Sequence, residues 1–257
     1  MINLKLIALL AQNDLRARYR GSVIGKLWLV VTPLVMLLLY SLVFSTIFKA
    51  RWESLGVSAY SSYAIVLFPG LMMYQLMMEV LQKGGTAYDT YAPITTKLNI
   101  SALDLILGGL LASLIPFWIT IAIWYLIVSA LFSPSMQGFA LVLITTLAFS
   151  GFCVGLALLS TVLGALLKDW VQLVAMVGMG LLFISPVLYP VDHLPKPLQQ
   201  AIYLNPLSHF VDVIRRGAFQ PDLALSPLSL LPVVVMTTLA LVAGIWLERV
   251  LARFTHE

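Results

Sequence analysis

His209 and Asp212 are the residues of this chain whose types and spacing come nearest to a catalytic pair. A separation of three residues places both side chains on one face of a helix. An imidazole beside a carboxylate could act as a general base or bind a metal ion. Either role needs a nucleophile or further ligands, and the sequence holds no Cys/His cluster with metal-ligand spacing. We therefore interpret the pair as polar contacts at an interface. A membrane enzyme that modifies lipids is an alternative class of protein. It would need acidic or histidine catalytic groups, and besides His209 and Asp212 the sequence offers only Glu79.

Residues 21–27 contain two glycines and a lysine, as phosphate-binding loops do. The spacing from Gly21 to Lys26 is one residue too short for such a loop, and Leu27 stands where Ser or Thr is required. The sequence therefore encodes no nucleotide site here. Gly21 with Gly25, and Gly151 with Gly155, also fit the small-xxx-small pattern that lets membrane helices approach closely. That pattern is common by chance in apolar chains.

Three cations, Arg16, Arg18 and Arg20, follow a segment in which apolar and polar residues alternate from residue 2 onward. This pattern predicts an amphipathic helix that lies on the inner leaflet with its cations near anionic headgroups. The alternative is a basic anchor that only sets the orientation of the chain.

The polar residues discussed above lie within or between five long apolar stretches. None of these stretches contains Asp, Glu, Lys or Arg: residues 27–48, 54–78, 105–167, 170–191 and 223–247. A membrane-spanning helix needs about 20 apolar residues. The stretch 105–167 is long enough for two helices joined by a turn at residues 133–138, so the sequence predicts six spans. Charges inside a membrane usually mark ion or proton pathways. Their absence predicts that the chain does not power transport by itself.

The composition places the whole chain in one membrane domain. The chain has 257 residues, of which 61% are hydrophobic and 10% charged, with a mean hydropathy of +0.99. Soluble domains are about half apolar and about a quarter charged. The net charge of +4 is spread over the span ends and forms no patch for nucleic acid. The single cysteine, Cys153, lies in an apolar stretch and can form no intrachain disulfide.

The expected spans are residues 27–48, 63–81, 103–131, 138–167, 171–189 and 228–247. With the N-terminus in the cytoplasm, ten Lys and Arg residues lie inside and five outside. Positive residues concentrate on the cytoplasmic side, so both termini are predicted to be cytoplasmic. An even number of spans requires the same result.

Aromatic residues occur deeper in the predicted spans than the membrane interfaces, where Tyr and Trp usually gather. An uncharged path lined with aromatic rings suits sugars, because their C–H faces stack on rings. The candidate path residues are Tyr40, Phe44, Trp118, Phe183 and Tyr189. The alternative is that these rings face lipid or pack between helices.

The predicted inner loop, residues 83–102, contains signals for local order. Gly84-Gly85 could end the second span, and Pro93 could begin a short helix that reaches Lys97 or Leu98. Ser101 and Asp104 could form a capping box for the third span. A small exposed helix of this kind would suit a soluble partner, or it could be only a connector.

The predicted outer segment, residues 190–222, is long yet still apolar. Leu194, Leu198 and Ile202 recur at helical spacing, and Asn205-Pro206 supplies an N-cap and a first helical residue. Arg215-Arg216-Gly217 places cations and a stop at the helix end. Two short helices are predicted, and they either re-enter the bilayer or lie flat at its surface.

Three motifs resemble the membrane subunit of type-2 ABC exporters, in particular the exporters of bacterial polysaccharides. They are RYRGSVIGKLW at residues 18–28 with TPL at 32–34, ISPVLYP at 184–190 with LP at 194–195, and LNPL at 204–207 followed by Arg215-Arg216. Their order and the six-span frame cover essentially the whole chain.

The resemblance implies a homodimer that works with two copies of a separate ABC ATPase subunit, which binds ATP and Mg²⁺, so this chain carries no cofactor. It implies an interface helix within residues 1–26 and a coupling segment within 83–102, including Tyr88, Asp89, Tyr91 and Lys97. It also implies an outer gate within 190–222, including Pro190, Asn205, Pro206, Arg215 and Arg216. Arg16, Arg18 and Arg20 are candidate contacts for the diphosphate of a polyprenyl-linked glycan.

We therefore expect an all-α integral membrane protein of a bacterial inner membrane. Its expected function is the export of a lipid-linked polysaccharide, with O-antigen ahead of capsule and teichoic acid. A drug exporter of the same superfamily is a more distant alternative, and a simple pore is disfavoured because nothing polar lines the spans.

Overall fold

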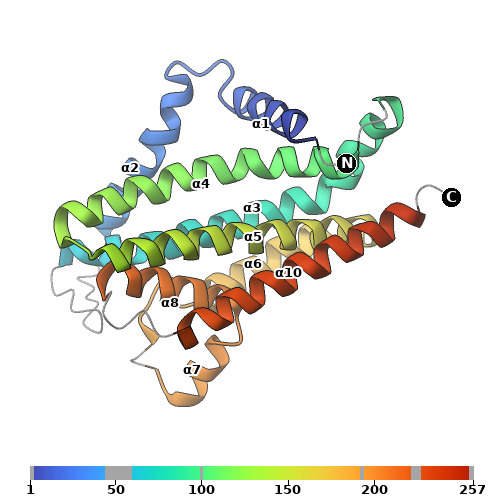
Figure 1. The fold of residues 1–257 in the computed structure, drawn as a ribbon. Helices are drawn as coiled ribbons and strands as arrows, with labels where there is room; N and C mark the ends of the chain where they lie inside the picture. Colours follow the sequence, from blue (N-terminus) through green and yellow to red (C-terminus); the bar gives the residue numbers. More distant parts are fainter. Residues whose placement is uncertain (1–2, 44–59, 99–100, 192–193, 221–226, 255–257) are drawn as a thin grey trace.

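The computed structural model describes residues 3–43, 60–98, 101–191, 194–220 and 227–254, and these contain helices and no strand (Figure 1). In chain order the helices are α1 (Leu4–Arg18), a short 3-10 turn (Gly25–Leu27), α2 (Trp28–Ser41), α3 (Tyr60–Leu98), α4 (Ala102–Phe132), α5 (Met136–Leu166), α6 (Trp170–Ile184), α7 (Lys196–Ile202), α8 (Pro206–Phe219) and α10 (Pro227–Phe254). The predicted all-helical class is confirmed for the described residues.

Four described helices are long and apolar enough to cross a membrane. The qualifying segments are Tyr63–Tyr91, Ala102–Phe132, Met136–Leu166 and Leu230–Leu247. Two further apolar helices, α2 and α6, are shorter than a full span. Residues 44–48 of the first expected span lie outside the described residues. The membrane character of the chain is therefore established, whereas six spans with both termini inside stays a prediction.

Helix α3 corrects the expectation for the inner segment. The helix continues without interruption through Gly84, Gly85 and Pro93 to Leu98, so the predicted end at Gly84 and the separate short helix are wrong. The glycines serve packing instead. A Cβ atom on Gly84 would lie 2.4 Å from the carbonyl oxygen of Ala157 on α5, and only glycine permits this approach.

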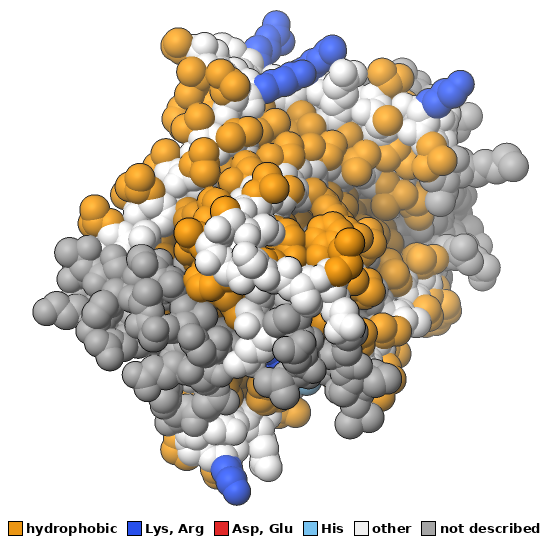
Figure 2. All heavy atoms as spheres, turned by 60° about the vertical axis from the view of Figure 1, so that its left-hand side comes forward, with side chains coloured by type: hydrophobic (Ala, Val, Ile, Leu, Met, Phe, Trp, Pro, Cys, Tyr) orange, Lys and Arg blue, Asp and Glu red, His pale blue; other side chains and the backbone are white. Residues whose placement is uncertain are grey.

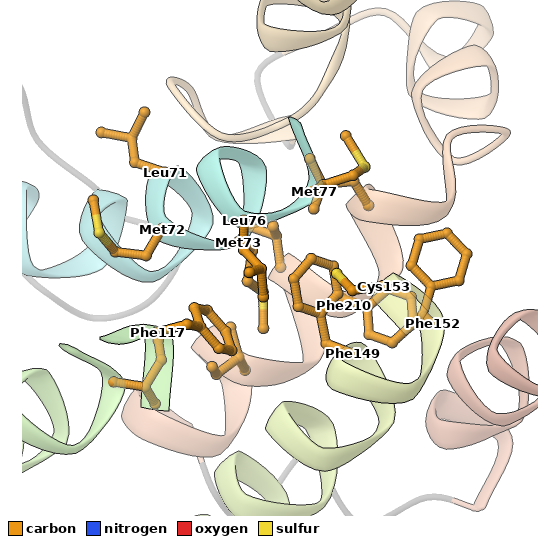
Figure 3. Packing of buried hydrophobic residues seen from close by; sticks show 14 of the residues in the cluster. Leu71, Met72, Met73, Leu76, Met77, Phe117, Phe149, Phe152, Cys153 and Phe210 are labelled. Atoms are coloured by element: carbon orange, nitrogen blue, oxygen red, sulfur yellow. The ribbon is translucent and has the colours of Figure 1, made fainter. Parts of the chain in front are cut away.

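The core lies where α3 and α5 cross, with α4, α8 and α10 packed around them. Figure 3 shows methionine and leucine side chains of α3 beside the rings of α4, α5 and α8. Phe149 on α5 stacks edge-on against Phe210 on α8, with ring centroids 5.1 Å apart. Because α8 is amphipathic and buries its apolar face here, α8 is packed into the helix bundle, whereas α7 projects from it (Figure 1).

The surface of the bundle is strongly apolar. Figure 2 shows a mostly hydrophobic face with Lys and Arg side chains mainly toward its two ends. Exposed leucine, valine, methionine and phenylalanine side chains occur along α2, α6 and α10. Exposed apolar patches of this extent mark contact with a membrane or with another chain.

Helix α1 lies against the first half of α4 (Figure 1). It buries Ile7 and Ala11. Close contact is possible because Gly108 faces Leu10, where a Cβ atom on the glycine would approach within 2.6 Å. The amide of Asn3 donates a 3.2 Å hydrogen bond to the buried carboxylate of Asp104. The predicted N-terminal amphipathic helix is thus observed, and it packs on protein.

Two local predictions fail at the helix ends. Ser101 is the N-cap residue of α4, but its side chain makes no capping hydrogen bond, and the carboxylate of Asp104 accepts from the amide of Asn3. The linker glycines Gly21 and Gly25 have φ of 81° and 52°, and a Cβ atom added to either would meet no atom within 4 Å. They therefore form turns and do not pack helices.

Candidate functional site

A network of charges joins α1, α3 and α4. Arg18 on α1 lies 2.5 Å from the carboxylate of Glu79 on α3. Lys83, one turn farther along α3, lies 3.3 Å from Asp14 and 3.4 Å from Glu79. On α4, the hydroxyl of Ser113 donates to Glu79 and accepts from Lys83, both at 2.8 Å. This network was not predicted from the sequence, although the i, i+4 spacing of Glu79 and Lys83 was a visible signal.

A groove of about 210 Å³ lies beside this network, between α2, α3 and α4. Its polar walls include Thr32, Gln75 and Thr120, and Arg18 and Glu79 border it as well. The hydroxyl-bearing Ser113 also lines the groove, and the remaining lining side chains are aromatic or apolar: Tyr19, Trp28, Leu29, Pro33, Met36, Met72, Leu76, Pro116 and Phe117. A concave site with apolar walls and a few placed polar groups is the usual form of a ligand-binding site.

The three candidate lipid-contacting arginines have different surroundings. Arg16 and Arg20 are exposed, whereas Arg18 is bound to Glu79. Burial alone would lower the pKa of Arg18, but the hydrogen bond and charge of Glu79 outweigh burial and raise that pKa. A diphosphate would have to compete with Glu79 for Arg18, so Arg16 and Arg20 are the more available cations.

The candidate coupling residues lie on the last turns of α3. Tyr88 is 38% exposed, and Asp89 is also exposed. Tyr91 is half-buried and its hydroxyl faces Gly109 on α4. Lys97 belongs to the helical backbone of α3, and its side chain lies outside the described part of the chain. The structure therefore brings Tyr88 and Asp89 to the surface and sets Tyr91 against α4.

The outer segment is fastened to the bundle by Arg215. This residue is only 4% exposed and donates to three backbone carbonyl oxygens: Val66 at 2.8 Å, Pro186 at 2.5 Å and Val187 at 2.8 Å. One guanidinium thus joins α8 to α3 and to the chain just after α6. Arginine suits this role because it presents several donors in a rigid fork.

Asn205 and Pro206 begin α8 as predicted. The side-chain oxygen of Asn205 accepts from the amide of Leu207 at 3.1 Å, and its amide group donates to Ser185 at 2.6 Å. Arg216 pairs with Asp212 at 2.9 Å, and Pro190 is half-buried in the connection from α6 to α7. The helix continues past Gly217 to Phe219, so the stop predicted at Gly217 is wrong.

His209 and Asp212 do not form a catalytic pair. The Nε2 atom of His209 lies 2.8 Å from the carbonyl oxygen of Tyr203, while Asp212 binds Arg216. Across the described residues no three His, Cys, Asp or Glu side chains cluster as metal ligands would. Both residues serve local contacts of the outer segment.

The candidate aromatic path residues lie in different environments. Phe183 on α6 is 68% exposed, and Tyr189 follows it, donating through its hydroxyl to the Phe183 carbonyl oxygen at 2.7 Å. Tyr40 is half-buried against the core. Trp118 is half-buried and donates to Ser150 on α5 at 3.1 Å, which fixes it between α4 and α5. Phe44 lies outside the described residues.

The helices and their apolar surface define a multi-pass membrane protein. A family model described as ABC-2 type transporter matches residues 5–219, so the chain belongs to the ABC-2 type transporter family. Members of this family are the membrane components of ABC transporters.

Several curated proteins are similar to this chain over most of its length. The O-antigen export system permease protein RfbA of Klebsiella pneumoniae is 22% identical over 80% of this chain and 77% of its own. The capsule polysaccharide export inner-membrane protein CtrC of Neisseria meningitidis serogroup B is 24% identical over 86% and 82%. The polysialic acid transport protein KpsM of Escherichia coli is 21% identical over 92% and 90%.

Proposed function

We propose that this chain is the membrane subunit of an ATP-driven exporter that moves a lipid-linked polysaccharide across the bacterial inner membrane. The observation that carries this proposal is the similarity to three kinds of polysaccharide exporter over more than three quarters of each protein. O-antigen is the first candidate substrate and capsular polysaccharide the second. A teichoic acid or a drug ranks below them.

The energy source is a separate ATPase. Among the described residues of the four long apolar segments, the charged side chains are Glu79, Lys83, Asp89 and Asp104; Glu79 lies near the middle of Tyr63–Tyr91, and Asp104 lies at the beginning of α4. Glu79 is bound to Arg18, Lys83 and Ser113, and Asp104 accepts from the amide of Asn3, so neither carboxylate is placed in a relay that would carry protons across the membrane. The exposed side chains Tyr88 and Asp89 on the last turns of α3 are suited to docking that partner.

Two copies of the chain enclose the path of the glycan. Helices α2 and α6 both pack on α3 and expose large apolar side chains away from it. Short spans of this kind are favourable when protein covers them. Phe183 lies at the last turn of α6 and Tyr189 in the connection after it, beside the backbone that Arg215 binds. In this proposal that connection, with α7 and α8, is the outer gate.

Glycolipid analysis of a strain that lacks this gene tests the proposal. We expect polyprenyl-linked glycan to accumulate inside the cell while surface polysaccharide disappears, with both restored by the intact gene. The composition of the accumulated glycan distinguishes O-antigen from capsule. Unchanged surface and intracellular glycans would reject polysaccharide export.

A further inference from the structure

The groove between α2, α3 and α4 contains polar side chains that the fold itself does not use. Thr32, Gln75 and Thr120 come from three different helices and line the same groove. Within the described part of the chain none of their side chains makes a hydrogen bond. Thr120 is buried, and buried polar groups are normally hydrogen-bonded, whereas Thr32 and Gln75 are exposed at the open side of the groove.

Other threonines of this protein bond their hydroxyls to backbone carbonyl oxygens of their own helices. Thr146, Thr161 and Thr238 each donate to the carbonyl oxygen four residues earlier, at 2.7, 3.0 and 2.8 Å. Thr237 does the same at 2.7 Å. Thr32 and Thr120 make no such bond, so their hydroxyls remain available to a molecule in the groove.

The charges of the groove cancel. Arg18 and Glu79 border it and neutralise each other through their 2.5 Å contact. A phosphate would gain little from a site without net positive charge, because charge-assisted bonds provide most of its binding. Hydroxyl groups, by contrast, can both donate to and accept from the amide of Gln75 and the threonine hydroxyls.

The walls and the size of the groove also fit a sugar. Trp28, which is 39% exposed, and Tyr19 contribute rings on which the C–H face of a sugar can stack. The volume of about 210 Å³ is below the roughly 300–1,000 Å³ of sites for drug-sized ligands. One sugar ring is the matching unit, and a longer oligosaccharide is too large.

We infer that this groove binds a single sugar residue, the one attached directly to the lipid diphosphate. This inference rests on the proposed export function and assigns the diphosphate to other groups, such as Arg16 and Arg20. The groove, which is bordered by the end of α1, would then select glycosylated lipid over bare lipid at the inner leaflet.

The test is a binding comparison on the purified full-length chain in lipid nanodiscs. The probes are a short-chain polyprenyl diphosphate without sugar and the same lipid carrying either one N-acetylhexosamine or one hexose. We expect a sugar-bearing lipid to bind about tenfold more tightly than the bare lipid, the combined effect of two or three hydrogen bonds.

Gln75→Leu, alone and with Thr120→Val, should remove this preference and leave the affinity for bare lipid unchanged. The matched control is Thr238→Val on α10, which removes a hydroxyl that bonds only to its own helix. Gln75 is exposed, so its single variant should fold even where the buried Thr120 proves sensitive.

Equal binding of all three lipids by the unaltered chain would overturn the inference. If Gln75→Leu weakened the binding of all three lipids equally, the inference would also be overturned, because the groove would then bind the lipid headgroup or tail and not the sugar. Neither result would contradict the proposed export function, because that function is tested separately by the surface glycan of the strain that lacks the gene.

Discussion

Arg215 on α8 donates a 2.8 Å hydrogen bond to the backbone carbonyl oxygen of Val66 on α3. The residues lie 149 positions apart in the sequence, so the contact closes the outer segment onto the first long helix. The same guanidinium also binds the backbone just after α6. The position of α8 therefore depends on this buried cation as well as on the apolar face that α8 packs against α5.

Arg215→Met should destabilise the protein, because it leaves three buried carbonyl oxygens without their donor. A hydrogen bond to a charged group contributes about 1.5–3 kcal/mol, so we expect a loss of at least about 3 kcal/mol. The measurement is the unfolding temperature of the detergent-solubilised chain. Arg216→Gln is the control, since its pair with Asp212 is partly exposed and contributes below about 1 kcal/mol. Equal unfolding temperatures for the two variants would contradict the role of Arg215.

Glu79→Gln should loosen α1 from α3 without unfolding the bundle. The variant weakens the contacts to Arg18 and Lys83, which are partly exposed and contribute modestly to global stability. We expect trypsin to cleave faster at residues 16–26 in inverted membrane vesicles, as followed by mass spectrometry. Asp169→Asn, whose exposed side chain caps no helix, is the control. A cleavage rate equal to that of the control would show that the network does not hold α1.

Charge reversal at the end of α3 should impair docking of the partner ATPase. Asp89→Lys and Lys97→Glu change the charge of the proposed coupling segment while leaving the core unaltered. We expect less ATPase to co-purify with the membrane subunit, although the chain still inserts. Lys196→Glu at the beginning of α7 serves as the control, since it belongs to the outer segment. Undiminished co-purification would exclude this docking site.

Phe183→Ala should lower export if exposed rings of α6 line the glycan path. Trp246→Ala on α10 removes an aromatic ring of similar exposure from a different helix and should leave export near normal. Surface polysaccharide per molecule of membrane protein is the quantity to measure. The candidate path also includes Tyr40, Phe44 and Trp118, and replacing these three together by alanine should lower export without lowering dimer yield. Normal export by both the Phe183 and the triple variant would remove the aromatic path.

Gly155→Leu should separate α5 from α10. A Cβ atom at this position would already lie 2.4 Å from the backbone of Ala240, and overpacking of this kind costs about 1–3 kcal/mol or more. Gly180→Ala on α6 is the control, because nothing lies within 4 Å of its added carbon. Thermal unfolding in detergent should fall for the first variant and hold or rise for the second. A similar result at both positions would mean that the close α5–α10 contact is dispensable.

Hydrophobic length predicted much of this fold. The stretches around residues 103–131, 138–167 and 228–247 became long helices, because the bilayer demands uninterrupted apolar residues with internal backbone bonds. Asn205 and Pro206 predicted the start of α8, since capping depends on neighbouring residues. Gly84 misled the prediction, because whether a glycine ends a helix or admits a neighbour depends on what packs there.

The candidate sites were only partly visible in the sequence. The sequence identified Arg18 as a candidate cation. It could not identify Glu79 as the partner of Arg18, because the two residues lie 61 positions apart on different helices. Arg215 was placed in the outer segment, yet its three carbonyl partners could not be inferred, because backbone oxygens carry no sequence signature.

The sequence by itself determined the membrane class, the amphipathic first helix and the two short helices of the outer segment, because each follows from local hydrophobic pattern and capping. Only the tertiary structure decided which polar groups meet: Arg18 with Glu79, Arg215 with Val66, and three unbonded polar side chains around one groove. Such contacts join residues far apart in the chain, and their geometry is set by how the helices cross.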